Sequence, residues 1–276
     1  MSACGIFIGY NEEGEKYMKR KLVSIISSAL IAVQVLAMPI IANAEAHATY
    51  ITDSCFTDCS IGGNKKLGYY GLNIIMDGSP WLSKGSASTH YETYMYDEER
   101  QVDYCNFYSN SMKGESFGAG SMYVYQRDTT SNFKQTFGYC QFDIRMHDGV
   151  MELNIGEFSD PTSNMNRIAN RITFQPDSIT ASDGAKTVTV ANIAPEKWYT
   201  VKIVVDNILQ EVSISVTDVA TGKMIGSIEN AMYKESDCGA VKIWCFGYKR
   251  NNEYNYDLTH VTISKWDGEK NPYSIK

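Results

Sequence analysis

The chain has 276 residues, of which 43% are hydrophobic, and a formal net charge of −7 at pH 7. An acidic chain of this kind argues against nucleic acid as a partner, because phosphate contacts need a basic surface. The same charge argues against electrostatic adhesion to anionic lipid.

The N-terminal part of the sequence has the organisation of a targeting segment. A basic head at 18–21 precedes an apolar run over 22–37, and Ala42-Asn43-Ala44 then provides a small-x-small cleavage site. This order predicts a secretory signal peptide over residues 18–44. A retained membrane anchor is the alternative, which the short run and the cleavage site disfavour.

Two further boundaries follow from this assignment. Residues 1–17 carry three glutamates, unlike a signal head, and we interpret them as an upstream extension. The mature chain is expected to be a single domain over residues 45–276 and to be secreted, with no membrane contact after cleavage.

Six cysteines fall in the predicted mature chain: Cys55, Cys59, Cys105, Cys140, Cys238 and Cys245. An even number in an exported chain permits disulfides, although the spacing does not fix the pairs. Buried free thiols are the alternative. Cys55 and Cys59 have the spacing of half a zinc site, but no second pair of ligands follows at metal spacing.

Alternating apolar and polar residues, rich in Val, Ile, Thr and aromatic side chains, recur through the mature chain. Turn sequences such as 147–149 (His-Asp-Gly) and 221–223 (Thr-Gly-Lys) separate these runs. Many short strands at regular spacing predict an all-β antiparallel sandwich of two sheets. The expected strands cover residues 121–127, 138–146, 150–158, 171–175, 187–191, 198–206, 211–218, 223–228, 240–248 and 258–266.

Two of these strands carry the candidate binding residues. Alternation in strand 138–146 places Gln141, Asp143 and Arg145 on a polar face opposite the core. In strand 240–248 the same rule sets Trp244, Phe246 and Tyr248 on one face, which we expect to be exposed as a binding surface. Burial of both faces of this strand is the alternative.

Two segments resemble strands of the concanavalin A-like jelly rolls. Residues 137–146 (FGYCQFDIRM) are similar to the F-G-x-x-x-F-D/E-x-R strand, and residues 197–206 (KWYTVKIVVD) to the W-Y-x-V-x-I-x-x-D strand of laminin-G-like members. The resemblance covers roughly residues 120–268. It implies two stacked sheets, one of which carries a sugar-binding groove in many members.

The function that these features favour is binding of a polysaccharide or glycan without catalysis. Aromatic rings fit the C–H faces of sugar rings, while carboxylate and guanidinium groups bind hydroxyls. A surface domain that binds a protein partner is a further alternative. The expected ligand-binding residues are Gln141, Asp143, Arg145, Trp244, Phe246, Tyr248 and Tyr254.

A glycoside hydrolase is one enzymatic alternative. Residues 152–157 (ELNIGE) are similar to the E-x-D-x-x-E strand of laminarinase-type enzymes, which would make Glu152 the nucleophile and Glu157 the acid/base. Asn154 replaces the central aspartate of that motif. Residues five apart on a regular strand also face opposite sides, so the two glutamates are not expected to meet.

A polysaccharide lyase is the other enzymatic alternative. Gln141, Arg145 and His147 share one strand face, and such residues neutralise a uronate carboxylate and move its proton in jelly-roll lyases. Residues 247–255 (GYKRNNEYN) also distantly resemble the Y-x-K-x-G-x-Y motif of alginate lyases, although the glycine is missing. The acidic composition disfavours a uronate-binding groove.

A calcium ion is the one cofactor that the sequence suggests. Jelly rolls often hold one near the chain ends, where Asp77 and Asp267 would supply oxygen ligands. Asp-Gly turns explain the same two residues without a metal. The four histidines show no spacing typical of a metal site.

Overall fold

The structure is a computed structural model that describes residues 46–54, 65–66, 81–84, 90–109, 121–125, 136–157, 167–239, 241, 243–246 and 253–276. Glu45–Lys276 forms one compact unit by its internal contacts. The predicted signal peptide lies outside the described residues and stays a prediction. In the described part, no helix is long and apolar enough to cross a membrane.

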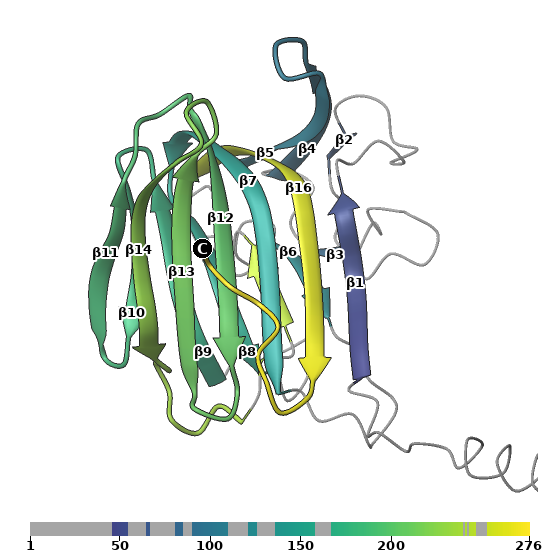
Figure 1. Ribbon diagram of the computed structural model, residues 1–276. Helices are drawn as coiled ribbons and strands as arrows, with labels where there is room; N and C mark the ends of the chain where they lie inside the picture. Colours follow the sequence, from purple (N-terminus) through teal and green to yellow (C-terminus); the bar gives the residue numbers. More distant parts are fainter. Residues whose placement is uncertain are drawn as a thin grey trace, which may run out of the picture. The chain divides into compact units, whose positions relative to one another are not determined.

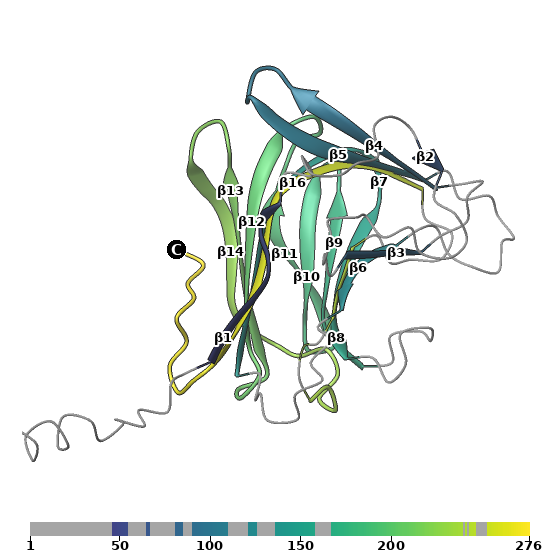
Figure 2. The ribbon, with the colours of Figure 1, turned by 90° about the vertical axis from the view of Figure 1, so that its right-hand side faces the viewer.

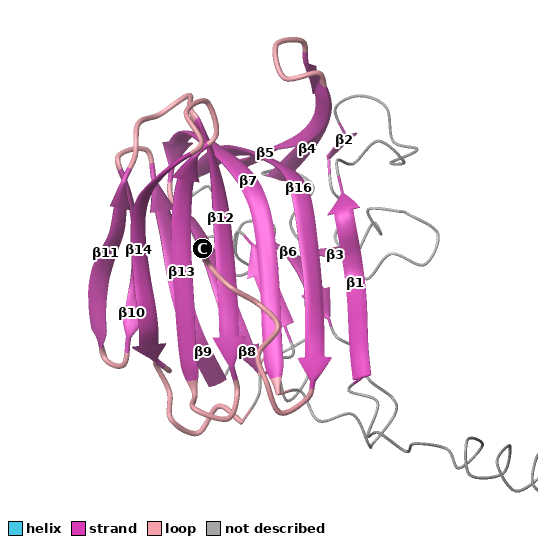
Figure 3. Ribbon diagram, in the orientation of Figure 1, coloured by secondary structure: helices cyan, strands magenta, loops and turns pink. Residues whose placement is uncertain are grey.

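Strands are the regular elements of the described chain, and they form two antiparallel sheets (Figures 1 and 3). The first, sheet A, has nine strands in the order β14-β13-β12-β7-β16-β5-β4-β2, with β1 paired to β16. The second, sheet B, has seven strands in the order β11-β10-β9-β8-β15-β6-β3. The predicted all-β, two-sheet antiparallel jelly-roll sandwich is thereby confirmed.

The strands from β6 onward overlap the predicted runs, except β10, which was not predicted; strands β1 to β5 had no predicted counterpart. Sheet A contains β1 (Ala46–Ser54), β2 (Lys65–Lys66), β4 (His90–Asp97), β5 (Val102–Ser109), β7 (Phe137–Gly149), β12 (Trp198–Asp206), β13 (Glu211–Asp218), β14 (Lys223–Met232) and β16 (Tyr254–Asp267). Sheet B contains β3 (Trp81–Lys84), β6 (Ser121–Tyr125), β8 (Met151–Glu157), β9 (Arg167–Gln175), β10 (Ser178–Asp183), β11 (Lys186–Asn192) and β15 (Ile243–Phe246).

The hydrophobic core lies between the two sheets, which Figure 2 shows as two layers. Phe142 of β7 is fully buried and contacts rings from sheet B. Its ring centroid lies 5.9 Å from that of Phe174 and 5.2 Å from that of Phe246. Offset and edge-to-face contacts of this kind stabilise a core beyond the area that they bury. The opposite face of β7 therefore turns away from sheet B, and we call this side of the sheet the outer face of sheet A.

Strand β16 organises the outer face of sheet A. It pairs with β7 along most of its length, with β5 at its beginning and with β1 at its end. Asp257 of β16 is consequently opposite Arg145 of β7 on one side and Asn106 of β5 on the other. Three strands that are distant in the sequence thus bring polar side chains together.

The expected exposure of the β15 aromatic residues is wrong. Trp244 and Phe246 are 0% exposed and belong to the core between the sheets, so the face chosen as outward in the sequence points inward. Cys245, on the other face, is also buried. The alternative of a strand buried on both faces is confirmed here, whereas Tyr248 lies outside the described residues.

The disulfide prediction is wrong for four of the six cysteines. Cys105, Cys140, Cys238 and Cys245 are buried free thiols. Burial raises the pKa of Cys140 well above its usual value and that of Cys238 to about 12, because a buried thiolate loses its hydration. Cys55 and Cys59 lie outside the described residues.

Candidate functional site

A cluster of charged and aromatic side chains lies on the outer face of sheet A. Its members come from the β4–β5 hairpin and from strands β7, β12 and β16, where cross-strand pairing places them side by side. We call it the arginine–aspartate cluster. It consists of Asp97, Arg100, Asp143, Arg145, His147, Trp198 and Asp257.

Asp257 is the buried centre of this cluster, with 1% of its surface exposed. Arg145 donates to its Oδ2 from Nε at 2.7 Å and contacts the same oxygen through a terminal guanidinium nitrogen at 2.6 Å. Asn106 donates to the other oxygen, Oδ1, at 2.8 Å. A buried carboxylate is costly unless it is paired and hydrogen-bonded, and here it is both.

His147 extends this pairing toward solvent. Its Nε2 is 2.8 Å from Asp257 Oδ2, and its Nδ1 is 2.8 Å from Glu196 Oε2. The hydrogen bond to Asp257, together with the bond to Glu196 and the two negative charges, raises the pKa of His147 above its usual value, although burial opposes this. Both ring nitrogens face groups that only accept, so the ring that fits this geometry is the imidazolium.

Asp143 anchors the other arginine of the cluster. Its Oδ2 lies 2.5 Å from a terminal nitrogen of Arg100, and its Oδ1 accepts a hydrogen bond of 2.6 Å from the Thr200 hydroxyl. The Asp143 side chain is only 8% exposed. It therefore holds Arg100 in place and does not itself reach the solvent.

The β4–β5 turn places Arg100 beside Asp143. Asp97 Oδ1 accepts backbone N–H bonds from Glu99 and Arg100, as aspartate commonly does in turns. Its other oxygen accepts a bond of 3.0 Å from the indole of Trp198. These bonds and the two nearby guanidinium groups lower the pKa of Asp97, while desolvation, the largest single effect, acts in the opposite direction.

Trp198 lies against both guanidinium groups. The central carbons of Arg100 and Arg145 are 4.6 and 4.7 Å from its ring centre, which is cation–π geometry. Tyr104 packs edge-on against the same ring at 5.6 Å. The result is a rigid array in which planar charged groups and aromatic rings alternate.

An exposed tyrosine borders this array. Tyr108 of β5 is 39% exposed and lies opposite Asn255 of β16. Alternation along β5 gives it the same face as Tyr104 and Asn106. Asn106, which binds Asp257, also donates to the side chain of Asn255 at 2.8 Å. Polar side chains therefore connect Asp257 to Asn255, the residue opposite Tyr108.

The residues proposed for a lyase do not form a set of free acids and bases. Arg145 and His147 meet, as their shared face predicts, but both are bound to Asp257. The Gln141 side-chain oxygen accepts a hydrogen bond from Tyr139. The Tyr104 hydroxyl lies 3.5 Å from Met95 Sδ, and burial raises its pKa above the usual value. A neutral base to take a proton is thus missing among these residues.

The glutamates proposed for a hydrolase have separate partners. Glu152 is buried and lies 3.6 Å from Arg171, whereas Glu157 contacts Arg167 at 3.4 Å. In the pairing with β9 the register shifts between Ile155 and Gly156, but the extra residue, Ala169, lies in β9 and not in β8. Glu152 and Glu157 therefore keep opposite positions in the alternation along β8, as expected for residues five apart.

The remaining expected ligand residue, Tyr254, is 2% exposed and packs in the core against Tyr256. It therefore does not form a rim, because alternation along β16 directs it inward. Within the described residues, no three His, Cys, Asp or Glu side chains are grouped so that they would hold a metal ion. Asp77 lies outside these residues, so the calcium expectation stays a prediction.

Sequence reasoning identified Arg145 and Asp143 but missed their partners. Asp97, Arg100, Trp198 and Asp257 lie on other strands, and single-strand alternation cannot show which strands become neighbours. The similarity of residues 197–206 to a laminin-G-like strand was the one signal that pointed near Trp198.

Comparisons with known proteins identify no family for this chain. No protein-family model and no curated protein matches the chain. A sialidase structure aligns over 66% of this chain with 10% identity and a TM-score of 0.43, and the chain spans about a fifth (20%) of its length. A family 7 alginate lyase in complex with substrate aligns over 64% of this chain and 83% of its own, with 12% identity and a TM-score of 0.44. Peanut lectin aligns over 71% and 96%, with 11% identity and a TM-score of 0.42.

At TM-scores below 0.5, these similarities carry no argument about this chain. The arginine–aspartate cluster is the feature from which a function can be inferred.

Proposed function

We propose that the chain is an exported domain that binds a polysaccharide or glycan on the outer face of sheet A, without cleaving it. The observation that carries this proposal is the fixed array of Arg145, Asp257 and His147 beside Trp198. It supplies polar groups and ring surfaces whose positions are set before any ligand arrives, which reduces the entropic cost of binding.

The chemistry of the array suits sugar hydroxyls. A hydroxyl both donates and accepts, so it pairs with guanidinium N–H groups as well as with carboxylate oxygens. Arg145 is 19% exposed and Glu196 is 66% exposed, so both signs of charge reach the surface within one small area. Tyr108 adds a ring on which the apolar side of a sugar can rest.

The absence of catalysis in this proposal is based on the contacts within the cluster. A lyase or hydrolase needs a base or acid that can reach a proton of the substrate. Here both ring nitrogens of His147 contact carboxylates, and Asp257 Oδ2 contacts both Arg145 and His147. These groups are suited to hold a ligand and not to exchange protons with it.

The test is a screen of the chain from Glu45 onward against immobilised neutral and uronate polysaccharides. Each incubation is examined for retention on the polymer, and for new reducing ends or the absorbance of an unsaturated uronate. Retention without product is the expected result. Product formation would contradict the non-catalytic proposal, and the absence of both on every polymer would favour a protein partner.

A further inference from the structure

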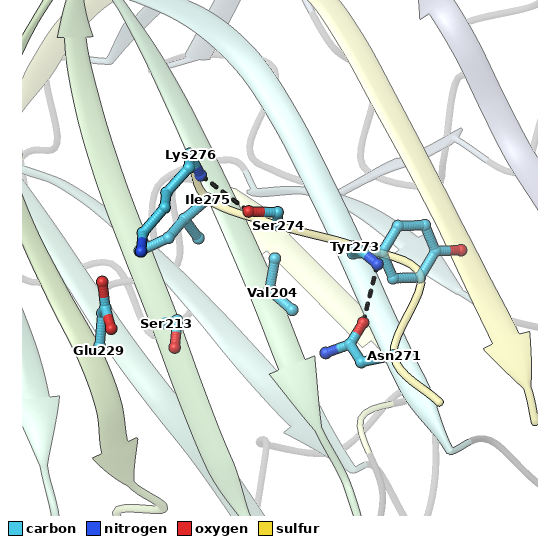
Figure 4. A pocket seen from close by; sticks show the side chains of 8 residues that line it. All are labelled: Val204, Ser213, Glu229, Asn271, Tyr273, Ser274, Ile275 and Lys276. Carbon is cyan, nitrogen blue, oxygen red and sulfur yellow. Dashed lines mark hydrogen bonds between the residues drawn. The ribbon is translucent and has the colours of Figure 1, made fainter. Parts of the chain in front are cut away.

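A pocket that shares no residue with the arginine–aspartate cluster lies on the outer face of sheet A. It lies where residues 271–276 cross strands β12 and β13 and has a volume of about 220 Å³ (Figure 4). This is smaller than the pockets of about 300–1,000 Å³ that hold drug-sized ligands, so it suits one small ligand or a single unit of a longer one. The residues that determine its chemistry are Val204, Ser213, Glu229, Asn271, Ile275 and Lys276.

The wall formed by residues 271–276, here called the C-terminal strap, is firmly attached to the sheet. Tyr273 stacks on Tyr139 of β7 with 5.0 Å between ring centres, and its hydroxyl accepts a bond of 2.9 Å from Ser264. The Ser215 hydroxyl donates to the Ile275 carbonyl at 2.7 Å. Ile275 is 7% exposed, so its side chain is packed. The pocket wall is therefore a built part of the fold.

The opposite wall contains a β-bulge. The pairing of β13 with β14 shifts between Val212 and Ile214, so that Ser213 faces two residues of β14, Glu229 and Asn230. Asn230 has a left-handed backbone conformation with a φ of 57°, and its N–H donates to the Ser213 hydroxyl oxygen at 3.0 Å. Bulges of this kind redirect side chains and are frequent beside binding sites. Here the bulge coincides with the position of Glu229 at the pocket.

The lining combines an apolar floor with polar groups of both charges. Val204 and Ile275 are buried and supply the apolar part. Around them stand the Glu229 carboxylate, the Lys276 side chain and the Asn271 amide, as Figure 4 shows. A lone anion would be repelled by Glu229 and a lone cation by Lys276. A neutral ligand with one apolar side and several hydroxyls meets neither penalty.

We infer that this pocket binds one unit of a neutral sugar, as a site separate from the arginine–aspartate cluster. The choice of ligand class rests on the proposed function, whereas the site itself rests on the strap and the bulge. Asn271 supplies an N–H donor, since its side-chain oxygen already accepts from Tyr273 N at 2.9 Å. Glu229 supplies the acceptor for sugar hydroxyls.

The inference is tested by ligand-observed NMR on the chain from Glu45 onward, with glucose, galactose, mannose and N-acetylglucosamine as probes. Glu229→Gln removes the charge, and Asn271→Asp keeps the acceptor for Tyr273 N but loses the donor. Both residues are exposed, so the variants should fold. Each should weaken binding of the recognised sugar by about tenfold. Glu98→Gln, an exposed substitution in the β4–β5 turn, is the matched control and should bind like the unchanged protein.

The outcomes separate this pocket from the proposed function. Monosaccharide binding that survives Tyr108→Ala but not the two pocket variants would support the inference. Binding that is equal in all variants, or absent from the unchanged protein, would overturn it. Polymer retention with no monosaccharide binding would overturn the pocket alone, whereas monosaccharide binding without polymer retention would support the pocket and contradict the proposed face.

Discussion

His147 and Asp257 are joined by a hydrogen bond of 2.8 Å between Nε2 and Oδ2, although the Asp257 side chain is 1% exposed. This bond links β7 to β16, and the contact of His147 with Glu196 extends the link to the segment that precedes β12. Arg145 binds the same carboxylate oxygen. The charge of the cluster near neutral pH thus depends on one imidazole.

The stability of the protein should therefore depend on pH through His147. The hydrogen bond to Asp257 is the largest of the effects that raise its folded-state pKa above the usual value of 6.5. A raised pKa contributes stability that is fully present below about pH 6.5 and is lost as the pH rises through the folded-state value. Denaturant unfolding over this range should show the loss, and a His147→Gln variant should show a smaller one. An equal pH dependence in both proteins would contradict the assignment.

Arg145 should contribute more to the free energy of unfolding than its partial exposure suggests. Arg145→Ala leaves Asp257 with His147 and Asn106 alone, so the free energy of unfolding should fall by about 3 kcal/mol. Arg145→Lys keeps the charge but loses the planar contact with Trp198, and should cost about 1 kcal/mol. Chemical denaturation measures both values. Equal losses in the two variants would show that the buried carboxylate does not need a cation.

Trp244 should act on stability and not on glycan binding. Trp244→Ala empties a fully buried position and should cost about 3–5 kcal/mol. Within the described residues its buried indole nitrogen has no hydrogen-bond partner, so Trp244→Phe should cost less, about 1–2 kcal/mol. Polymer retention by the folded Trp244→Phe protein should be unchanged. Loss of retention at full stability would restore Trp244 as a ligand residue.

A pair of glycines provides a test of the turn geometry. Both Gly149 and Gly184 have a positive φ, 75° and 57°. A β-carbon on Gly149 would lie 2.1 Å from the Glu253 carbonyl oxygen, whereas a β-carbon on Gly184 would meet no described atom within 4 Å. Gly184→Ala should cost about 1 kcal/mol of conformational strain. Gly149→Ala should cost at least ~3 kcal/mol, because backbone must also shift. Thermal unfolding of the two variants distinguishes these costs, and similar melting temperatures would contradict the described contact.

The sequence was informative about strands because alternation is a local property. Strands β12 and β13 match their predicted bounds, Trp198–Asp206 and Glu211–Asp218, to the residue. The same rule failed at β15 because both faces of that strand are apolar and buried. Period-2 alternation separates two faces but does not say which of two apolar faces meets the other sheet.

Only part of the candidate site could be predicted from the sequence, for a different reason. Asp143 and Arg145 could be grouped from one strand, but their pairing with Arg100 and Asp257 depends on which strands are neighbours. Those contacts join residues 43 and 112 positions apart. The free thiols could not be foreseen for a similar reason, because the number of cysteines in a sequence does not show which of them lie close together.

The most direct test of the central claim compares two exposed tyrosines of the β4–β5 hairpin. Tyr108 and Tyr96 are 39% and 47% exposed, but alternation and pairing place only Tyr108 on the face of the arginine–aspartate cluster. Titration calorimetry with a polysaccharide that the protein retains would be repeated on Tyr108→Ala and Tyr96→Ala. The account predicts binding that is about tenfold weaker for Tyr108→Ala and unchanged for Tyr96→Ala. Full affinity in Tyr108→Ala, or an equal loss in both variants, would contradict a glycan site on the outer face of sheet A.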